Sequence, residues 1–266
     1  MWLVLGGKGK TGRRVAERLT ARGLPVRAVS RSGDPAFDWE DSSTWPGVLP
    51  GVRAVYITYQ PDLAFPGAVE RVGSFVDLAV RAGVSRFVLL SGRGEDGAQA
   101  GEKVVQHAGA EWTIVRASWF AQNFSESFLL DAVLDGELAL PAGEAAEPFI
   151  DVEDIADVVV EALTGEGHAG QVYEVTGPRL LTFGDVAAEL SAATGREVRY
   201  VPVTADEYAA ELVKAGEPVE IVDLFTETLD GRNAYLSDGV RRALGREARD
   251  FRDYAEDAAA TGVWNR

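Results

Sequence analysis

The sequence predicts an α/β fold in which a doubly wound parallel sheet is joined to a smaller C-terminal capping subdomain. Two observations support the sheet: apolar strand-like runs alternate with helical segments through about residue 175, and a glycine turn joins the first run to the first helix. The remainder of the chain lacks this alternation. We therefore expect a sheet domain over residues 1–175, with a cap segment inserted near 118–150. A smaller α/β subdomain over 176–266 is expected to cover the carboxyl edge of the sheet.

The composition argues against several classes of protein. The chain has 266 residues, of which 46% are hydrophobic, and a formal net charge of −16, whereas a generic nucleic-acid binder needs a basic face. Cysteine is absent and the histidines are His107 and His168, so neither a disulfide framework nor a metal site is expected. No apolar run reaches membrane-spanning length, and the first residues enter a strand directly. We expect a cytoplasmic protein that binds neither nucleic acid nor membrane, and a homo-oligomer is compatible with the sequence.

The first expected strand, Trp2–Leu5, leads through glycines into the first expected helix, Thr11–Arg22. Gly7-Lys8-Gly9-Lys10-Thr11-Gly12 fits G-x-G-x-x-G, and with Gly6 it also fits G-x-x-G-x-x-G. Glycines allow a tight turn, a close approach of the backbone to a pyrophosphate and close packing of helix on strand. The helix N-terminus adds N–H groups that attract phosphate. A P-loop is excluded because its first glycine would fall at Val4. The pattern predicts a Rossmann dinucleotide site formed by Gly6, Gly7, Gly9, Lys10, Thr11 and Gly12.

The second expected strand, Pro25–Val29, ends where such folds usually hold an acidic residue for the ribose 2′-hydroxyl of NAD. Ser30-Arg31-Ser32 stands there instead, and no carboxylate follows until Asp34. Because an arginine suits a 2′-phosphate, we predict that Arg31 favours NADP, supplied as NADPH, over NAD. Two alternatives stay open: NAD as the cofactor, and a solvated surface arginine at position 31.

Two segments further along the chain add candidate cofactor contacts. Phe37–Trp39 is expected to form a short third strand, in which Asp38 either accepts a hydrogen bond from the adenine amino group or is an ordinary loop residue. Val52–Thr58 is a continuous apolar run, as buried parallel strands are. Its carboxyl end carries Thr58 and Tyr59, at the edge where ligands bind in open α/β sheets, so we assign both to the cofactor site.

A helix over Ala68–Ala82 is expected from its apolar spacing, and Gly83 ends it. Val84–Leu90 is the next expected strand and is followed by Ser91. The Ser91 hydroxyl is a candidate to bond the substrate carbonyl or the nicotinamide ribose; capping of the following segment is the alternative.

An aromatic group follows the next helix, Gly101–Ala108, and the next strand, Trp112–Arg116. Its members are candidates to form the walls of a site for a flat polycyclic substrate, and packing in the core is the alternative. For Phe149, further along, packing in the core is the expectation. The candidate substrate contacts are Tyr59, Trp119, Phe120 and Phe124.

The rest of the chain supplies further elements. Asp151, Glu153 and Asp154 lie close to an expected helix start, where capping explains them. His168 lies in a glycine-rich loop and is expected to face solvent. The expected strands are 171–175 and 197–201, and the expected helices are 125–134, 155–163, 182–194, 205–214, 238–244 and 251–260.

The chain resembles the NmrA-like branch of the atypical short-chain dehydrogenase/reductase superfamily nearly from end to end. Members of this branch include NADPH-dependent quinone reductases, enzymes of ergot-alkaloid and aromatic polyketide pathways, and regulators that bind NAD(P) without turning it over. The segments that carry the resemblance are 6–12, 30–31, 56–61, 91–92, Arg116-Ala117-Ser118-Trp119-Phe120-Ala121-Gln122-Asn123-Phe124 and Phe149-Ile150-Asp151-Val152-Glu153-Asp154-Ile155-Ala156.

One motif of the larger superfamily is incomplete in this chain. Typical members carry Tyr-x-x-x-Lys, whose tyrosine protonates or deprotonates a substrate oxygen. The matching segment is Gln99-Ala100-Gly101-Glu102-Lys103, in which the lysine is present but Gln99 cannot act as an acid. Lys103 is therefore a candidate to hold a ribose hydroxyl, with an ordinary surface lysine as the alternative.

Without that acid, the reduction of a ketone would lose a factor on the order of a hundred or more. A quinone accepts hydride to give a delocalised anion that solvent protonates, and an iminium becomes neutral. We therefore predict an NADPH-dependent oxidoreductase of quinone-like or conjugated polycyclic aromatic substrates, with Ser91 and Lys103 as catalytic candidates. Two alternatives are a non-enzymatic NAD(P)-binding redox sensor, and a tailoring monooxygenase of aromatic polyketides that forms a hydroquinone which reacts with O₂.

Overall fold

A computed structural model describes residues 1–216, 219 and 221–265, and the chain divides into two compact units. The first unit, called the sheet unit, comprises Met1–Ala117, Val152–Val175 and Asp238–Arg246. The second unit comprises Ser118–Asp151, Thr176–Ser237 and Glu247–Arg266. Residues 238–246 thus belong to the sheet unit, whereas the sequence analysis placed them in the C-terminal subdomain.

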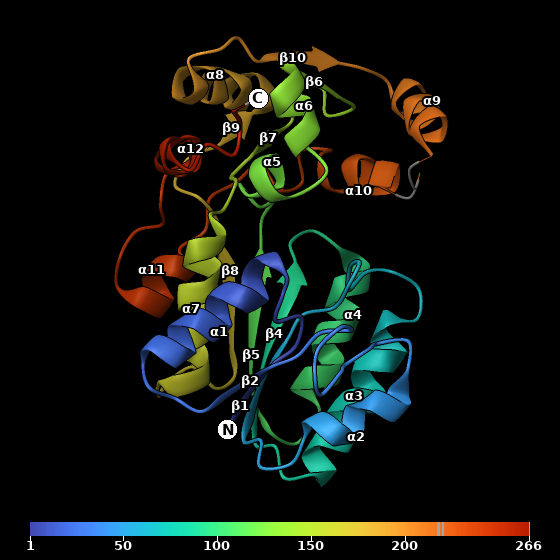
Figure 1. The fold of residues 1–266 in the computed structure, drawn as a ribbon, viewed down its shortest axis with the longest axis vertical. Coiled ribbons are helices and arrows are strands. Elements are labelled where there is room, and N and C mark those ends of the chain that lie inside the picture. The colour runs from blue at the N-terminus through green and yellow to red at the C-terminus, as the bar shows by residue number, and fades with distance from the viewer. Residues whose placement is uncertain (217–218, 220, 266) are drawn as a thin grey trace. The chain divides into compact units, whose positions relative to one another are not determined.

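The sheet unit is built on a six-stranded sheet in the order β2-β1-β3-β4-β5-β8, in which every neighbouring pair is parallel (Figure 1). The chain runs outward from β1 in both directions, which is the arrangement of a doubly wound sheet and confirms the predicted fold class. The strands are β1 (Trp2–Val4), β2 (Val26–Ala28), β3 (Ala54–Ile57), β4 (Arg86–Gly92), β5 (Glu111–Ala117) and β8 (Gln171–Val175).

Helices cover both faces of this sheet (Figure 1). On one face α1 (Lys10–Ala21) packs along α7 (Val152–Thr164), and on the other α3 (Ala68–Arg81) packs against α4 (Asp96–Gln106). The strands at the middle of the sheet are therefore covered on both faces, which is why β1 and β3 are apolar and buried along their whole length. The remaining elements of this unit are η1 (Ser42–Thr44), α2 (Trp45–Val48) and α11 (Gly239–Leu244).

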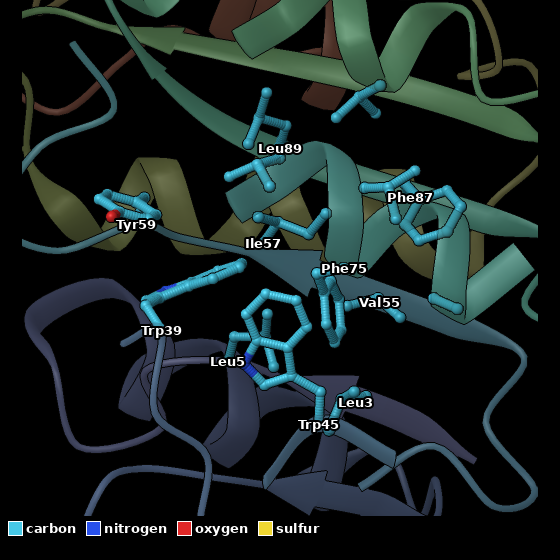
Figure 2. Packing of buried hydrophobic residues seen from close by; sticks show 14 of the residues in the cluster. Leu3, Leu5, Trp39, Trp45, Val55, Ile57, Tyr59, Phe75, Phe87 and Leu89 are labelled. Atoms are coloured by element: carbon cyan, nitrogen blue, oxygen red, sulfur yellow. The ribbon is translucent and has the colours of Figure 1, made fainter. Parts of the chain in front are cut away.

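The expected third strand over 37–39 is wrong. Phe37 and Trp39 lie instead in the core, with their ring centroids 4.9 Å apart and each packed edge-on against Phe75 of α3. Figure 2 shows Trp39 and Phe75 among the apolar side chains of the sheet face. Alternating burial in this segment arises because a loop lies across the core, a pattern that a half-buried strand also produces.

The second unit contains two small sheets. β6 (Glu137–Leu140) pairs in parallel with β10 (Arg199–Pro202), and β7 (Ala146–Glu147) pairs antiparallel with β9 (Leu181–Thr182). Phenylalanines at the centre of its core contact one another edge to face. The helices are α5 (Asn123–Glu126), α6 (Leu130–Asp135), α8 (Phe183–Thr194), α9 (Ala205–Ala215), α10 (Ile221–Thr228) and α12 (Phe251–Ala260).

Several element boundaries differ from the expected ones. The helix expected to begin at Gly101 begins at Asp96, and the helix expected over 125–134 is interrupted by Ser127, whose backbone is extended. Strands β6, β7 and β9, of two to four residues, were not anticipated because they carry too little periodicity to be recognised. Helix α10 was not anticipated either. None of the helices in the described part of the chain has the length and apolar character that crossing a membrane requires.

Candidate functional site

The glycine turn after β1 has the geometry that a phosphate cradle requires. Gly6 adopts a φ of +64°, which favours glycine, and its carbonyl accepts a hydrogen bond from the Gly9 N–H at 2.8 Å. A Cβ built on Gly12 would lie 2.2 Å from that same carbonyl oxygen. The first turn of α1 therefore packs against the loop at a distance that only glycine allows at position 12.

Helix α1 begins at this turn. Gly9 is its N-cap residue and has no side chain to cap the helix, and the first turn carries no acidic residue. The exposed helix N-terminus therefore keeps its affinity for an anion. The N–H groups of Gly7 and Gly9 donate to the carbonyls of Val29 and Gly6, each at 2.8 Å, so the candidate donors to a dinucleotide diphosphate are the N–H groups of the first turn of α1, from Lys10 to Gly12. Contacts of the cofactor with Gly6, Gly7, Gly9, Lys10, Thr11 and Gly12 stay predictions.

Thr11 differs from the other residues of the turn because its side chain is bonded to the sheet. Its side chain is buried, and its Oγ1 accepts a hydrogen bond from the hydroxyl of Tyr56 at 2.9 Å. Burial raises the pKa of Tyr56, so this phenol stays protonated and remains a donor. Thr11 is thus anchored to the sheet through its side chain, and only its backbone faces the candidate phosphate position.

Two cationic side chains lie in segments that meet beyond β2. Arg31 is exposed in the segment after β2, and Lys8 of the glycine turn donates from Nζ to Oγ of Ser32 at 2.8 Å. Arg31 was predicted from the sequence as a cofactor contact, whereas Lys8 was not, although this lysine lies inside the glycine motif. A 2′-phosphate placed after β2 would meet Arg31 and Lys8 together with the Ser32 hydroxyl.

Asp38 and Thr58 take part in the local structure beside this region. Asp38 accepts the Glu40 N–H at 3.0 Å through Oδ1, and the Thr58 carbonyl accepts the indole N–H of Trp39 at 3.2 Å. The Asp38 carboxylate therefore organises its own turn, as the loop interpretation expects. A contact of Asp38 or Thr58 with adenosine stays a prediction.

Tyr59 is also largely buried. Its ring packs against Trp39 with centroids 5.1 Å apart (Figure 2). Its hydroxyl accepts a hydrogen bond from Nη1 of Arg71 at 3.3 Å. Because one face of the ring is covered by Trp39, Tyr59 is placed to border a ligand site through its edge and hydroxyl rather than to form an open aromatic wall.

Ser91 lies at the carboxyl end of β4 and contacts a buried carboxylate. Its hydroxyl donates to Oε1 of Glu102 at 2.6 Å, and Glu102 also accepts two hydrogen bonds from Arg116, at 2.9 and 2.6 Å. Arg116 lies opposite Ser91 in the register of β4 and β5, and it also donates to Glu174 of β8 at 3.0 Å. The hydrogen bonds to Glu102 raise the pKa of Arg116, so the guanidinium stays charged. The network ties the ends of three neighbouring strands to α4.

In this network Glu102, and not Lys103, lies on the inward face of α4. Glu102 is 2% exposed, whereas Lys103, the next residue, is exposed to solvent. Successive residues of a helix point about a quarter-turn or more apart, so the lysine cannot share the position of the carboxylate. Lys103 thus lies on the exposed side of α4, and a catalytic or ribose-binding role for it stays a prediction.

The aromatic candidates after β5 belong to the second unit. Phe124 has no exposed surface, and its ring centroid lies 5.7 Å from both Phe149 and Phe251, so it forms core rather than a substrate wall. Trp119 is 9% exposed and donates from Nε1 to Oγ1 of Thr228 at 3.0 Å. Phe120 is half-buried and is more exposed than Trp119 or Phe124.

The carboxylates near the start of α7 form ion pairs, a role that capping alone does not describe. Glu153 accepts from Arg14 and Arg18 of α1, each at 2.5 Å, and the fully buried Asp154 pairs with Arg246 at 2.6 Å. Burial alone would raise the pKa of Glu153, but the two arginines outweigh it and lower that pKa. Among the described residues, no three His, Cys, Asp or Glu side chains are grouped as a metal site would require.

Comparison with known proteins adds the relatives of this chain. Residues 2–256 match the NmrA-like family. The NAD(P)H azoreductase of Xenophilus azovorans is 34% identical, with 98% of each chain covered. The agroclavine dehydrogenase of Claviceps fusiformis is also 34% identical, with 96% of each chain covered.

A solved structure shares the fold of this chain. The NADPH-dependent quinone oxidoreductase QOR2 of Escherichia coli, complexed with NADPH, has a TM-score of 0.81 and 20% identity, covering 97% of this chain and 99% of its own. By its sequence match over nearly its whole length, and by its doubly wound fold, the chain belongs to the NmrA-like family.

Proposed function

We propose that this chain is an NAD(P)H-dependent oxidoreductase that reduces quinone-like or other conjugated aromatic acceptors by hydride transfer, with NADPH as its preferred cofactor. When bound, the nicotinamide supplies the hydride. The residues of the chain bind the diphosphate at the glycine turn, orient the cofactor along the carboxyl edge of the sheet, and leave protonation of the product to solvent.

The observation that carries the choice of acceptor is the hydrogen bond from Ser91 to Glu102. A hydroxyl has one proton, and this one is held by a buried carboxylate at 2.6 Å. Ser91 therefore cannot donate to a developing alkoxide without breaking a charge-assisted bond. On α4, Gln99 stands in place of the superfamily tyrosine and cannot act as an acid, and Lys103 is exposed, whereas Glu102 is buried beside Ser91. This chemistry suits an acceptor whose reduced form is a stabilised anion, or one that becomes neutral on taking hydride.

The preference for NADPH is supported by the cations beyond β2. Arg31 and Lys8 contribute positive charge beside the Ser32 hydroxyl, in the place where an NAD enzyme usually holds a carboxylate. A 2′-phosphate would be stabilised there by charge-assisted hydrogen bonds. The names of the relatives, an NAD(P)H azoreductase and an NADPH-dependent quinone oxidoreductase among them, agree with a nicotinamide cofactor and a conjugated acceptor.

The test is an acceptor panel with purified protein. NADPH is mixed with a naphthoquinone, an azo dye and, as the matched control, a simple aliphatic ketone, while nicotinamide absorbance and O₂ uptake are followed. Oxidation of NADPH by the conjugated acceptors but not by the ketone is the expected result. Reduction of the ketone at a comparable rate would contradict the proposal.

The same experiment separates the two other candidate functions. Tight binding of NADPH without oxidation by any acceptor would favour a redox sensor, which the missing superfamily tyrosine on α4 also fits. O₂ uptake coupled to a new hydroxyl group on an aromatic product would favour a monooxygenase that acts through a hydroquinone.

A further inference from the structure

Arg71 of α3 connects two segments that end at the candidate cofactor edge. Its Nη2 donates to Oε2 of Glu40 at 2.6 Å, and its Nη1 donates to the hydroxyl of Tyr59 at 3.3 Å. Glu40 lies in the segment after β2, and Tyr59 follows β3. One guanidinium therefore bridges two segments that are distant in the sequence.

The position of these segments gives the bridge its significance. In the sheet order β2-β1-β3, the segments after β2 and β3 lie on either side of the glycine turn that follows β1. If the diphosphate of a dinucleotide sits at the N-terminus of α1, its adenosine half extends between these two segments. The bridge thus joins the two segments that border the candidate adenosine position.

The two segments are also joined inside the core. The indole of Trp39 donates to the Thr58 carbonyl at 3.2 Å, and its ring contacts Tyr59. These contacts fix the backbone of both segments without Arg71. The Arg71 and Glu40 side chains, by contrast, are 33% and 65% exposed, and such exposed ion pairs contribute little to stability. Arg71 therefore has more influence on the orientation of Tyr59 and Glu40 than on folding.

The backbone of α3 leaves room for the Arg71 side chain. Gly67, the N-cap of α3, has a φ of +82°, and a Cβ built there would lie 2.4 Å from Nη1 of Arg71. The guanidinium thus folds back over the first turn of its own helix, toward Tyr59, through space that a larger residue at 67 would occupy.

We propose that Arg71 is a positioning residue for the adenosine half of the cofactor, because it fixes the Glu40 carboxylate and the Tyr59 hydroxyl beside the candidate adenosine position. This inference rests on the proposed function, since it assumes a dinucleotide at the glycine turn. The bridge acts on a part of the cofactor that NADPH and NADH share. It therefore changes the affinity for both by the same factor and leaves their ratio, which depends on Arg31 and Lys8, unchanged.

The test is calorimetric titration of NADPH and NADH into wild-type protein, Arg71→Gln and Tyr59→Phe. If the cofactor has to order one or two side chains that Arg71 orders in the wild type, its Kd should rise about three- to tenfold. We expect this rise for both cofactors in Arg71→Gln. The double variant Arg71→Gln/Tyr59→Phe is expected to bind no more weakly than Arg71→Gln alone, since both changes remove the same bridge. In steady-state assays of Arg71→Gln, KM for the cofactor is expected to rise while kcat at saturating cofactor stays within about twofold of the wild-type value.

Arg22→Gln is the matched control, because Arg22 forms an exposed ion pair with Glu161 at 3.4 Å on the α1–α7 side of the sheet; its Kd values are expected to equal those of the wild type. A Kd for Arg71→Gln that is unchanged for both cofactors would overturn the inference. A rise for NADPH alone would also overturn it, since Arg71 would then act directly on the 2′-phosphate. If wild-type protein binds neither cofactor, the proposed function itself fails.

Discussion

The hydroxyl of Ser91 donates a 2.6 Å hydrogen bond to the carboxylate of Glu102, and both side chains are buried. Glu102 lies on the helix where the larger superfamily carries its acid tyrosine, one residue before the lysine of that motif. In this chain the inward face of the helix therefore holds a structural carboxylate paired with Arg116. The first two predictions follow from this arrangement.

Removing the Ser91 hydroxyl is expected to have little effect on chemistry. Ser91→Ala should change kcat for quinone reduction by less than about threefold, because the hydroxyl proton is already held by Glu102; the loss of a positioned proton donor costs ~10²-fold or more. Stopped-flow or steady-state assays at saturating NADPH measure this directly. A hundredfold loss of kcat with unchanged cofactor affinity would show that Ser91 donates to the substrate.

Neutralising Glu102 is expected to destabilise the sheet unit. Glu102→Gln leaves the guanidinium of Arg116 without its principal partner, although Glu174 still accepts a hydrogen bond at 3.0 Å. Breaking a buried ion pair in this way costs about 3 kcal/mol of unfolding free energy. Urea unfolding measures the change, with Glu161→Gln as the control, since its exposed ion pair should contribute less than about 1 kcal/mol. Equal effects of the two substitutions would contradict the importance of the buried network.

Arg31 is expected to control the choice between the two cofactors. Arg31→Ala should weaken NADPH binding by about tenfold or more while leaving NADH binding unchanged, because a hydrogen bond to a charged group contributes about 1.5–3 kcal/mol. Lys8→Ala should act in the same direction. Competitive titration of both cofactors gives the ratio, and a ratio equal to that of the wild type would rule out the 2′-phosphate subsite.

The ion pairs between α1 and α7 are expected to make stability depend on pH in the acid range. The pKa of Glu153 in the folded chain lies below its ordinary value of 4.5 because Arg14 and Arg18 favour the charged form. Its contribution is therefore fully present above that ordinary value and is lost as the pH falls through the folded pKa. Unfolding midpoints measured from about pH 7 down to about pH 2.5 should fall more steeply below about pH 4.5 for wild-type protein than for Glu153→Gln. Parallel curves would contradict this assignment.

The parts of the fold that the sequence predicted are those specified by local or periodic patterns. The glycine turn at Gly6–Gly12 is a local pattern and the buried strands are continuous apolar runs. Both could therefore be predicted, and the structure confirms both. Phe37–Trp39 was mistaken for a strand because a loop lying on the core buries alternate residues as a strand does. In the second unit the strand expected over 197–201 is present as β10, whereas the short strands β6, β7 and β9 lacked a detectable period.

The candidate site likewise has residues that could be predicted from the sequence and residues that could not. The glycines could be found from their spacing, whereas the bonds from Ser91 to Glu102 and from Glu102 to Arg116 join separate elements and follow only from the packing of α4 on β4 and β5. Arg71 was missed because nothing in its local sequence distinguishes it from a surface cation. Lys8 was missed because it occupies an unspecified position of the glycine motif. Phe124 was assigned to a substrate wall because an aromatic residue after a strand has the same sequence signature in a core and in a ligand site. The cofactor contacts of Arg31, Asp38, Thr58 and Tyr59 stay predictions.

The central claim is that the glycine turn binds the diphosphate of a nicotinamide dinucleotide. Its most direct test is calorimetric titration of NADPH into wild-type protein, Gly12→Ala and Gly47→Ala. A Cβ at position 12 would lie 2.2 Å from the Gly6 carbonyl, whereas a Cβ at position 47 meets nothing within 4 Å. We expect saturable binding to the wild type and to Gly47→Ala, and affinity reduced by more than about tenfold in Gly12→Ala, because α1 must move away from the turn. No binding by the wild type at millimolar NADPH or NADH, or equal affinity in all three proteins, would contradict the claim.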